Sequence, residues 1–470
     1  MSVFTIKNEL IIDNPTNAMR KWCRDNLTIP NPQYAKAEEK GKWTGNIAKT
    51  LQMYYTVGNQ LRLPFGIARK FYKLFKNDVS QINALFAPIR RKTYNSSISL
   101  REYQKNAVEA ALKARNGVLV SPCGSGKSEM GLEIAARISG RTLWIVHTWD
   151  LANQILNRAA IRYNIPKESY GQIAAGKVNI GDVFTVATVQ TLSRIDLSKI
   201  QNEFDCIIVD ECQHVCSSAD KVTQFEKVIT SLCSPYLYGI TATPYRADGL
   251  ERCMFALLGD VIHKVPQSAV AGNTVPVRVK FVNTGYTPDI DDITDGDGTL
   301  NYAKLIGDIT ENKDRNAVIV GEIQRAAQNG GVLVLSDRLQ HLDSMEKRLC
   351  AVLPYRTARL GIASTKSEKE RRARILTDLN NGALNVVFAT YKLAKEGLDV
   401  PNLRTVVLSC PVKDKTTVIQ SAGRVARKAE GKEYGTVIDF SDAFGLLRGY
   451  EKKRRGYYKK NFYDFLSKND

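Results

Sequence analysis

The stretch from Gly117 to Ser128, GVLVSPCGSGKS, decides the fold of the chain around it. Its run Val118–Val120 is short and apolar, which predicts a buried strand that stops at Ser121-Pro122. A loop with two glycines follows, and residues 129–138 have the spacing of a helix. A strand, a glycine loop and a helix in this order aim several backbone N–H groups and the positive end of the helix at one point. The stretch therefore suits a polyphosphate.

Within this loop we expect the chain to hold the phosphates of ATP. Lys127 is expected to reach the β- and γ-phosphates, and the Ser128 hydroxyl to bind Mg²⁺. The phosphate-binding residues around them are Gly124, Ser125 and Gly126. Ser121 occupies the first glycine position of the strict phosphate-loop motif, but a small residue followed by proline resembles the loop of helicase-type ATPases. The loop alone is also compatible with an accidental glycine turn, so a second motif has to decide.

That second motif is Cys206–His214, CIIVDECQH. Its β-branched run predicts a strand of a parallel sheet, and the strand ends in a pair of carboxylates, where a phosphate-bound metal would be met. Asp210 would hold Mg²⁺ through water, and Glu211 would orient or deprotonate the water that attacks the γ-phosphate. The sequence Asp-Glu-Cys-Gln-His resembles the DExH box of superfamily-two helicases. This resemblance makes His214 a link between the ATP site and the motor.

Further blocks of the same superfamily flank these two motifs. Leu100-Arg101-x-Tyr103-Gln104 resembles the nucleotide-reading Q motif, in which Gln104 would read an adenine edge and Arg101 would also contact the nucleotide. Expected strands at 142–146 and 183–187 lead to segments that resemble the backbone-gripping parts of helicases. Their predicted DNA contacts are Thr148, Thr188 and Gln190.

The strand expected at 237–240 ends in Thr241-Ala242-Thr243-Pro244, which resembles the helicase coupling motif through Thr241 and Thr243. Directly after it, Tyr245-Arg246-Ala247-Asp248-Gly249 is similar to the Arg-Glu-Asp element of XPB-like helicases. Ala247 stands where that element has glutamate. The departure weakens the assignment of Arg246 as a DNA contact at a fork.

A second lobe is expected because the alternation of strands and helices continues in the second half of the chain without a phosphate loop. Its expected strands are 331–335, 385–388 and 405–409. The resemblance implies DNA contacts by Ser336 and Thr390, and nucleotide contacts by Gly397 and Asp399. The segment Gln420–Arg427 matches the pattern QxxGRxxR, with Gln420 among the catalytic residues. Arg424 and Arg427 are three apart, which predicts that they share one helix face and reach the γ-phosphate as arginine fingers.

The chain is accordingly expected to have an α/β fold with two RecA-like parallel-sheet lobes and a small α/β N-terminal domain. The predicted divisions are 1–95 for an accessory DNA-binding domain, 96–268 and 269–447 for the lobes, and 448–470 for a basic aromatic tail. Residues 265–297 are expected to connect the lobes, with 289–298 as a solvated loop.

In the first 95 residues, a strand pattern (3–12), a helix (15–26) and a basic amphipathic helix (67–76) are expected. The short signals Asn31-Pro32, Trp43-x-Gly45 and Leu63-Pro64-Phe65-Gly66 are similar to the N-terminal domain of UvsW-type helicases. An unrelated accessory domain with a solvated basic helix is the alternative.

The net charge of +19 is concentrated at the two ends of the chain. Residues 1–99 carry 16 Lys and Arg against 6 Asp and Glu, and residues 446–470 carry 8 against 3, which leaves only +4 for the rest. Such an excess beside an ATPase core favours a nucleic-acid partner over a membrane. In the tail, basic residues alternate with aromatic ones, which fits either nucleic-acid binding or a helix that packs on the second lobe through Tyr458, Phe462 and Phe465.

Composition sets further limits. The nine cysteines contain no CxxC pair, so we expect reduced thiols and no structural zinc. No charged-then-apolar leader and no apolar run of membrane-spanning length is found, which predicts a soluble protein of the cytoplasm, bacterial or of a phage-infected host. No internal repeat suggests a built-in oligomer, so a monomer is expected.

Taken together, six blocks between residues 100 and 427 resemble superfamily-two helicases in order and chemistry, and the XPB and UvsW group in particular. The resemblance implies ATP and Mg²⁺ as cofactors and ATP-driven translocation on duplex or branched DNA. It also implies branch migration, fork regression or displacement of RNA from R-loops, with an RNA–DNA hybrid among the substrates, in repair, recombination or replication. An RNA helicase with the same motor, and a nucleotide-switched DNA-binding module that does not unwind, are the alternatives.

Overall fold

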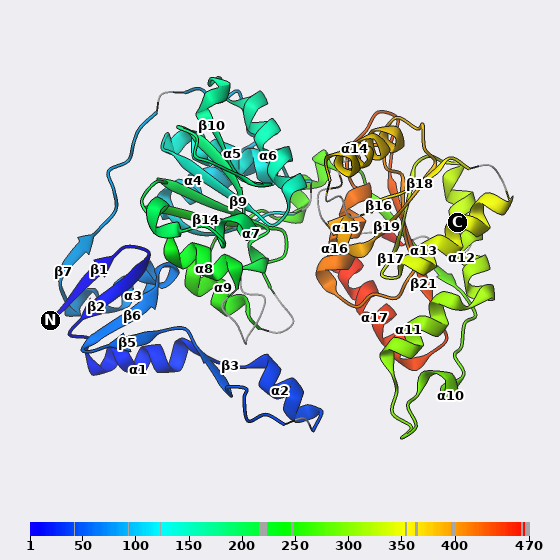
Figure 1. Cartoon of the computed structure of the whole chain (residues 1–470), viewed down its shortest axis with the longest axis horizontal. Coiled ribbons are helices and arrows are strands. Elements are labelled where there is room, and N and C mark those ends of the chain that lie inside the picture. The colour runs from blue at the N-terminus through cyan, green and yellow to red at the C-terminus, as the bar shows by residue number, and fades with distance from the viewer. Residues whose placement is uncertain are drawn as a thin grey trace. The chain divides into compact units, whose positions relative to one another are not determined.

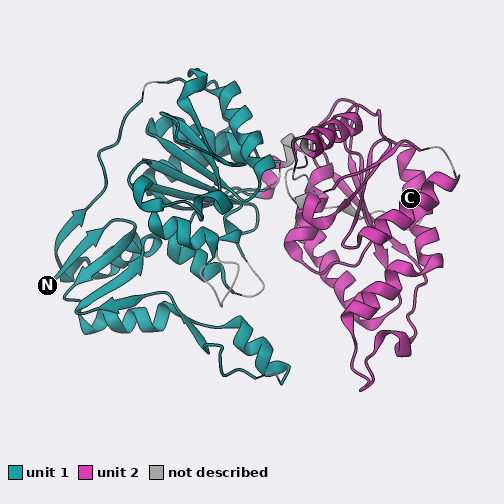
Figure 2. Cartoon of the chain, in the orientation of Figure 1, with its two compact units in different colours: residues 1–266 teal, residues 267–470 magenta. Residues whose placement is uncertain are grey.

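A computed structural model describes residues 1–41, 43–92, 94–122, 124–215, 223–245, 249–352, 355–361, 365–395, 398, 400–461 and 464–465 of the chain. The chain forms two compact units, residues 1–266 and 267–470 (Figures 1 and 2). Each unit contains its own parallel sheet, and the first also contains a small mixed sheet. The α/β class expected from the sequence, with a small N-terminal sheet and two larger parallel sheets, is confirmed.

The N-terminal part of the first unit is built on a five-stranded sheet with the order β5-β6-β2-β1-β7. Helices α1 and α3 pack on it around buried Phe4, Met19 and Phe71. An excursion of β3, α2 and β4 leaves this sheet between α1 and β5 (Figure 1). Its elements are β1 (Ser2–Ile6), β2 (Glu9–Asp13), α1 (Asn17–Asn26), β3 (Thr28–Pro30), α2 (Pro32–Glu39), β4 (Thr50–Gln52), β5 (Tyr55–Val57), β6 (Gln60–Pro64), the 3₁₀ turn η1 (Phe65–Ile67), α3 (Ala68–Phe75), η2 (Lys76–Asp78) and β7 (Val79–Ala84).

The rest of the first unit is an eight-stranded sheet with the order β11-β10-β12-β9-β13-β14-β8-β15, parallel except for the edge strand β11. Its strands read as continuous apolar runs because helices cover both faces. The elements are α4 (Glu102–Ala114), β8 (Asn116–Val120), α5 (Lys127–Ile138), β9 (Thr142–Val146), α6 (Trp149–Arg162), η3 (Lys167–Ser169), β10 (Tyr170–Ala174), β11 (Lys177–Asn179), β12 (Phe184–Thr188), α7 (Val189–Leu192), η4 (Leu197–Ile200), β13 (Cys206–Asp210), η5 (Cys212–His214), α8 (Gln224–Ser231), β14 (Tyr236–Thr241), α9 (Glu251–Leu258) and β15 (Val261–Lys264).

The small sheet and the large sheet of the first unit pack against each other, and each contributes a side chain to the core of the other. Phe65 of η1 packs against the core of the large sheet, and Ala256 of α9 belongs to the core of the small one. Between them, Gly66 lies against the backbone of α9 so closely that an added Cβ would meet Gly259 N, Ala256 O and Leu257 C. The Leu-Pro-Phe-Gly signal therefore marks the docking point of the N-terminal domain.

The second unit is a seven-stranded, fully parallel sheet with the order β18-β19-β17-β20-β21-β16-β22. Its elements are η6 (Gln267–Asn273), β16 (Val277–Asn283), α10 (Ile290–Ile293), α11 (Tyr302–Glu311), α12 (Lys313–Ala327), β17 (Val332–Ser336), α13 (Leu339–Val352), β18 (Thr357–Arg359), α14 (Lys366–Asn380), β19 (Val386–Thr390), α15 (Tyr391–Lys395), β20 (Thr405–Leu408), α16 (Lys415–Val425), β21 (Gly435–Ser441), α17 (Gly445–Lys460) and β22 (Asp464–Phe465).

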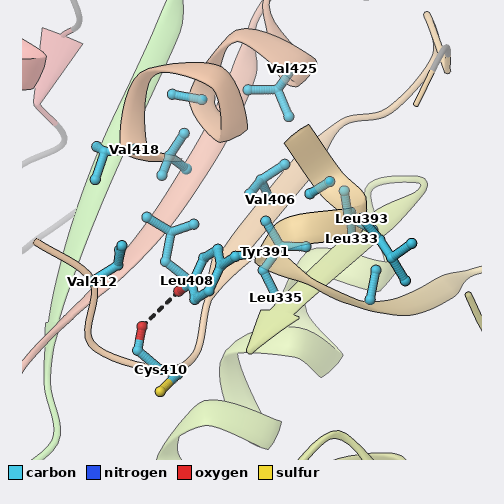
Figure 3. Packing of buried hydrophobic residues seen from close by; sticks show 14 of the residues in the cluster. Leu333, Leu335, Tyr391, Leu393, Val406, Leu408, Cys410, Val412, Val418 and Val425 are labelled. Carbon is cyan, nitrogen blue, oxygen red and sulfur yellow. Dashed lines mark hydrogen bonds between the residues drawn. The ribbon is translucent and has the colours of Figure 1, made fainter. Parts of the chain in front are cut away.

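Successive residues of β17 enter two different cores, which shows that both faces of this sheet are covered. Leu333 and Leu335 join one cluster, and Val332 and Val334 join the other. In the first cluster, the Tyr391 hydroxyl donates to the Cys410 carbonyl oxygen at 2.6 Å (Figure 3). This bond satisfies a phenol that is almost fully buried.

Three expected boundaries differ from the structure. Residues 277–283 form β16, an inner strand of the second sheet, so the connection between the units is shorter than 265–297. The acidic segment 289–298 is not all loop, because Asp289 caps the short helix α10 and Ile293 is buried. In the C-terminal segment a helix does pack through Tyr458, but it ends at Lys460, and Phe465 lies in strand β22. Phe462 lies outside the described residues.

Membrane-spanning helices and disulfide bonds can be assessed for the described residues. No described helix is long and apolar enough to cross a membrane. The seven described cysteines, Cys23, Cys206, Cys212, Cys233, Cys253, Cys350 and Cys410, are all free.

Candidate nucleotide-binding site

Three neighbouring strands of the first unit end together at one edge of the large sheet. The order β13-β14-β8 is parallel, and the register pairs Thr241 with Val120 and Asp210 with Ile240. The glycine loop, the coupling threonine and the carboxylate pair therefore all leave from the same edge. This is the edge at which open α/β sheets bind ligands.

The glycine loop needs its glycines for conformation and for space. Gly124 and Gly126 have φ angles of +79° and +78°, which favour glycine, and a Cβ on Gly126 would lie 2.5 Å from Gln104 Nε2. Ser121, the residue that departs from the strict motif, donates its hydroxyl to Ser125 Oγ at 2.6 Å. Lys127 and Ser128 then begin α5, so the N-terminus of this helix points toward the loop. Cys123 lies outside the described residues.

Gln104 supports the loop and does not face solvent. Its side chain is buried, its Oε1 accepts from the Arg101 backbone N–H at 2.9 Å, and its Nε2 donates to the Ser125 carbonyl at 2.9 Å. The Tyr103 hydroxyl donates to the same carbonyl at 3.0 Å. Each end of the Gln104 amide therefore makes one bond inside the protein, which leaves one N–H and one lone pair, and its contact with an adenine remains a prediction.

The carboxylate pair lies beside the loop lysine. Lys127 Nζ donates to Glu211 Oε1 at 3.4 Å, and Asp210 Oδ1 accepts from the Glu211 backbone N–H at 3.0 Å. Glu211 has a φ of +48°, a left-handed conformation that is uncommon outside glycine and that bends the chain sharply after β13. The bend places the two carboxylates side by side at the end of the strand.

Burial and neighbours push the two carboxyl pKa values apart. Burial raises the pKa of Asp210 to about 6, and the adjacent Glu211 carboxylate contributes in the same direction. Burial also acts to raise the pKa of Glu211, but Lys127, with Gln213 and two histidines, outweighs it and lowers that pKa below its ordinary value. Glu211 is the more readily ionised member of the pair, as a base that handles the attacking water requires.

Gln213 connects the hydrolysis residue to the coupling motif. Its Nε2 donates to Glu211 Oε2 at 3.0 Å, its Oε1 accepts from the Thr241 hydroxyl at 2.6 Å, and Thr241 Oγ1 in turn accepts from the Thr243 backbone N–H at 3.0 Å. All these side chains except Glu211 are buried. We call this chain of bonds the Gln213 relay.

The link expected through His214 remains a prediction, and the neighbouring Gln213 makes a bond to Thr241 that the sequence did not predict. The ring of His214 lies against that of His147, with centroids 5.1 Å apart, while Gln213 makes the bond to the coupling threonine. Sequence reasoning missed Gln213 although it lies within the quoted box. Its place two residues after Glu211 was the available signal; in the structure it lies within the 3₁₀ turn η5.

The donors at this edge fit a magnesium ion that is held mainly by phosphate. No described group of three or more His, Cys, Asp or Glu side chains could hold a metal ion. Asp210 is buried at the end of β13, and Ser128 lies in the first turn of α5, directly after the glycine loop. One carboxylate and one hydroxyl suit Mg²⁺, which keeps water and substrate oxygens as its other ligands.

The predicted backbone contacts of the first unit lie at strand ends, and the three described ones, Thr148, Thr188 and Gln190, also make bonds within the protein. Thr148 caps α6 and accepts from the Leu151 N–H at 3.4 Å. Thr188 is buried, with its hydroxyl 2.9 Å from that of Thr191, and Gln190 donates to the His147 carbonyl at 2.8 Å. The bond of Gln190 connects the end of β12 to the end of the neighbouring β9, whereas that of Thr188 is local. Arg246 lies outside the described residues.

In the second unit, one expected contact residue is inaccessible. Ser336 is fully buried and its hydroxyl lies 3.0 Å from His341 Nδ1, so the expectation that it grips a DNA backbone is wrong for this conformation. Thr390 is half-buried and accepts from the Leu393 N–H at 3.3 Å at the start of α15. Gly397 and Asp399 lie outside the described residues.

The two arginines of the second unit do not share a helix face, contrary to their spacing. Helix α16 ends at Val425, and Arg427 lies beyond it in an isolated bridge with Thr274. Arg424 donates from Nε to the Ala394 carbonyl at 3.0 Å and from Nη1 to the Leu398 carbonyl at 2.9 Å. Arg424 thus ties α16 to the segment after β19, while Arg427 belongs to the connection that follows. Gln420 is buried within α16.

Two family models match the chain along the same blocks. Residues 97–246 match the family described as type III restriction enzyme, res subunit, and residues 314–429 match the helicase conserved C-terminal domain. The first match covers most of the large sheet of the first unit, and the second covers β17 to β20 of the second unit, in the order that the motifs predict. The chain belongs to superfamily two of the helicases. As a member of that superfamily it is an ATP-dependent helicase or translocase, and hence an ATPase.

Relatives of this helicase carry the names of both DNA and RNA enzymes. An Acanthamoeba polyphaga mimivirus protein provisionally named an ATP-dependent RNA helicase is 28% identical over 88% of this chain and 77% of its own. The DNA 3'-5' translocase XPB2 of Sulfurisphaera tokodaii is 24% identical over 71% and 80%. The ATP-dependent DNA helicase uvsW of Enterobacteria phage T4 is 25% identical over 78% and 73%.

A solved structure supports the fold alone. The helicase resembles S. cerevisiae Dbp5 bound to RNA and ADP BeF3 with a TM-score of 0.54 at 15% identity, over 79% of this chain and 90% of that one.

Proposed function

We propose that this helicase is an ATP-driven DNA translocase that acts on duplex or branched DNA. Two relatives over most of this chain are named a DNA translocase and a DNA helicase, and the excess positive charge lies in the appended ends. Branch migration, fork regression and displacement of RNA from R-loops, in repair, recombination or replication, are the activities that we expect from such a motor. The observation that carries the proposal is the Gln213 relay, which ties the hydrolysis residue to the end of a second strand.

Lys127 and Glu211 have different roles in the proposed hydrolysis of ATP. Lys127 Nζ lies 3.4 Å from Glu211 Oε1, so a polyphosphate at the glycine loop would compete for its ammonium group. When Lys127 turns to the phosphates, Glu211 loses the neighbour that most lowers its pKa. Its carboxylate then becomes the stronger base for the proton of the water that attacks the γ-phosphorus, with ADP as the leaving group.

Magnesium is the implied partner of this chemistry. When bound, Mg²⁺ neutralises charge on the β- and γ-phosphate oxygens. In our proposal Ser128 and Asp210 hold it, and Asp210 does so in its deprotonated form. Because hydrolysis removes the γ-phosphate that Lys127 contacts, the Lys127–Glu211 contact can re-form, and Gln213 passes the change to Thr241.

The first test is Glu211→Gln, which keeps the hydrogen-bonding shape but removes the base. We expect ATP binding within a few-fold of the parent and turnover reduced by about 100-fold or more, since a positioned general base contributes about 10² to 10⁴. Nucleotide affinity and single-turnover hydrolysis are the measurements, with Glu203→Gln as the control carboxylate. Undiminished hydrolysis would remove Glu211 from the role.

The second test separates the proposed substrate from its rivals. ATPase stimulation and strand displacement should be greatest with forked or four-way DNA and with R-loops, and weaker with duplex RNA. An RNA helicase is the second candidate because one relative carries that name; stronger stimulation by RNA would establish it and overturn the proposal. If DNA stimulates the ATPase but the protein neither separates strands nor removes a protein roadblock from DNA, the chain is a nucleotide-switched clamp.

A further inference from the structure

We propose that the outer face of α17 binds the phosphate backbone of DNA. The inference rests on the proposed function, and it adds a contact surface that lies outside every helicase motif. It concerns the second unit by itself. Helix α17 is drawn in red at the end of the second unit's chain (Figure 1).

The inner face of α17 is anchored by buried groups. Leu447, Tyr450 and Tyr458 are buried in the main core of the second unit. Arg454 and Asp439 of β21 form an ion pair at 2.8 Å in which both side chains are almost fully buried, and the Tyr458 hydroxyl donates to the same carboxylate at 3.1 Å. Such a pair holds the helix in one orientation, because a broken pair would leave a buried charge without a partner.

Further bonds of Arg454 fix the helix to two neighbouring segments. Its guanidinium also donates to the Val412 carbonyl at 3.1 Å and the Phe440 carbonyl at 3.0 Å. Next to it, the Arg455 guanidinium lies 3.7 Å from the ring centre of Phe281 on β16. The outer face of α17 is therefore presented by a rigid support.

The outer face is basic along its length. Its exposed charged residues are Arg448, Lys452, Lys453, Lys459 and Lys460. The one acidic residue of the helix, Glu451, is half-buried and paired with Arg455 at 2.6 Å. Among the residues that the structure describes, no carboxylate lies within ion-pairing distance of the five exposed cations.

The five cations form two rows along the helix. At about 100° per residue, Arg448, Lys452 and Lys459 point within about 40° of one another, and Lys453 and Lys460 form a second row about 100° away. The positions between the rows are the three glycines of the helix, Gly445, Gly449 and Gly456, and an added Cβ on any of them would meet open space. A polyanion strand can therefore lie close to the helix with cations on both sides.

The length of the rows matches several phosphates. From Arg448 to Lys460 the helix rises by about 18 Å, at about 1.5 Å per residue. Phosphates of one DNA strand are spaced by about 3.4 Å along the duplex axis, but the strand winds around that axis, so the rows can meet some of the phosphates within this rise and not all of them.

Charge and composition favour DNA over a membrane or a protein. A membrane-binding helix needs an exposed apolar face, and the apolar side chains of α17 are turned into the core. The centre of a protein interface is depleted of charge and enriched in aromatic residues, whereas this centre consists of glycines between lysines. A regular row of phosphates can pair with the two rows of cations and needs no apolar contact.

The test is the double variant Lys452→Gln/Lys453→Gln, one residue from each row. Its control is Lys313→Gln/Lys347→Gln, which removes the same charge from exposed positions of α12 and α13. Affinity for duplex DNA is measured by fluorescence anisotropy between 50 and 300 mM salt. We expect the slope of log K against log salt to become shallower by about 1.8 in the α17 variant and to change less in the control, since each lost phosphate contact contributes about 0.9.

Three further readouts make the outcome decisive. Basal ATPase without DNA should stay unchanged in the α17 variant, and Lys459→Gln/Lys460→Gln should repeat the slope change. Equal slopes in variant and control would overturn the inference, as would stronger binding of the parent protein to vesicles of anionic lipid than to DNA. If the parent neither binds DNA nor is stimulated by it, the proposed function itself fails; if the parent does both and the variants match the control, only the role of α17 fails.

Discussion

Gln213 has two polar ends, and each is used by a different motif. The amide nitrogen holds the base Glu211, and the amide oxygen holds Thr241, which in turn orients the backbone of Thr243. An amide can do this without changing its charge during the cycle, unlike a histidine or a carboxylate. The residue is suited to report the position of Glu211 rather than to take its proton.

Replacing Gln213 should therefore separate hydrolysis from its stimulation. For Gln213→Ala we expect basal ATPase within about ten-fold of the parent, and a loss of most of the stimulation by DNA, because Thr241 is left without its buried partner. Steady-state ATPase with and without duplex DNA is the measurement. Thr241→Val, which removes the other partner, should give the same split, and a variant that retains full stimulation would show that coupling runs elsewhere.

His341 is held neutral inside the second unit. Its Nε2–H donates to Asn316 Oδ1 at 2.8 Å, and its Nδ1 lies 3.0 Å from the Ser336 hydroxyl, which also accepts from the Arg338 N–H at 3.2 Å. Burial lowers the pKa of His341 to about 3, and the positive charge of Arg315 contributes in the same direction. Burial and Arg315 therefore keep His341 uncharged, while Asn316 and Ser336 hold its ring in place.

This histidine should make the second unit sensitive to acid. Between pH 6.5 and pH 3 the unfolded chain binds a proton at His341 that the folded chain does not, so the free energy of unfolding falls as pH falls. Between pH 7 and pH 5 we expect the parent to lose about 1 to 2 kcal/mol more than His341→Gln in urea unfolding. His263→Gln in β15 is the control. Parallel losses in parent and His341→Gln would contradict a neutral buried His341.

At the scale of elements, periodicity and motif order were sufficient to predict the parallel strands. β9 coincides with the expected strand at 142–146, and β8, β13 and β14 differ from theirs by one or two residues. A buried parallel strand can be recognised in the sequence as a continuous apolar run, because both of its faces are covered. The glycine loop was predictable for a similar reason, since positive φ angles restrict its residue types.

Side-chain partners could not be predicted in the same way. Arg424 and Arg427 were separated by the end of α16, which no proline or glycine marks at that point. Gln104 carries the polar atoms that an adenine would need, and the fold gives each of them a bond inside the protein. The bonds of a polar side chain depend on residues far away in the sequence, and spacing within one motif does not contain that information.

Gly66 shows how tightly one element is joined to the next. A Cβ there would lie 2.6 Å from Ala256 O and 2.8 Å from Leu257 C, and backbone atoms cannot rotate away. We expect Gly66→Ala to destabilise the first unit by about 1 to 3 kcal/mol, the usual range for overpacking. Thermal unfolding and limited proteolysis between the small and large sheets are the measurements. Gly307→Ala in α11, with open space around it, should be neutral or stabilising; equal stability of both variants would mean that the docking point is loose.

At the scale of the molecule, the two units are complete folds with separate cores, and only the first contains a phosphate loop. We therefore expect ATP to bind to the first unit. The resemblance to superfamily-two helicases implies that Arg424 and Arg427 act on the γ-phosphate, and the two bonds of Arg424 to the carbonyl oxygens of Ala394 and Leu398 lead us to expect this role mainly of Arg427. The two arginines of one motif should then differ in what they do.

Arg427→Ala should therefore reduce hydrolysis by at least about 100-fold with little change in ATP affinity, because a guanidinium delivered to the γ-phosphate stabilises charge mainly in the transition state. Arg424→Ala should instead lower the thermal stability of the second unit, since it leaves two carbonyl oxygens without their donor. Arg427→Lys is the matched control: it keeps the charge but loses the planar fork, so it should recover only part of the rate. Nucleotide affinity, single-turnover hydrolysis and the unfolding midpoint are measured for all three. A loss of affinity alone in Arg427→Ala would place this arginine in ground-state binding, and a loss of stability equal to that of Arg424→Ala would make it a structural residue.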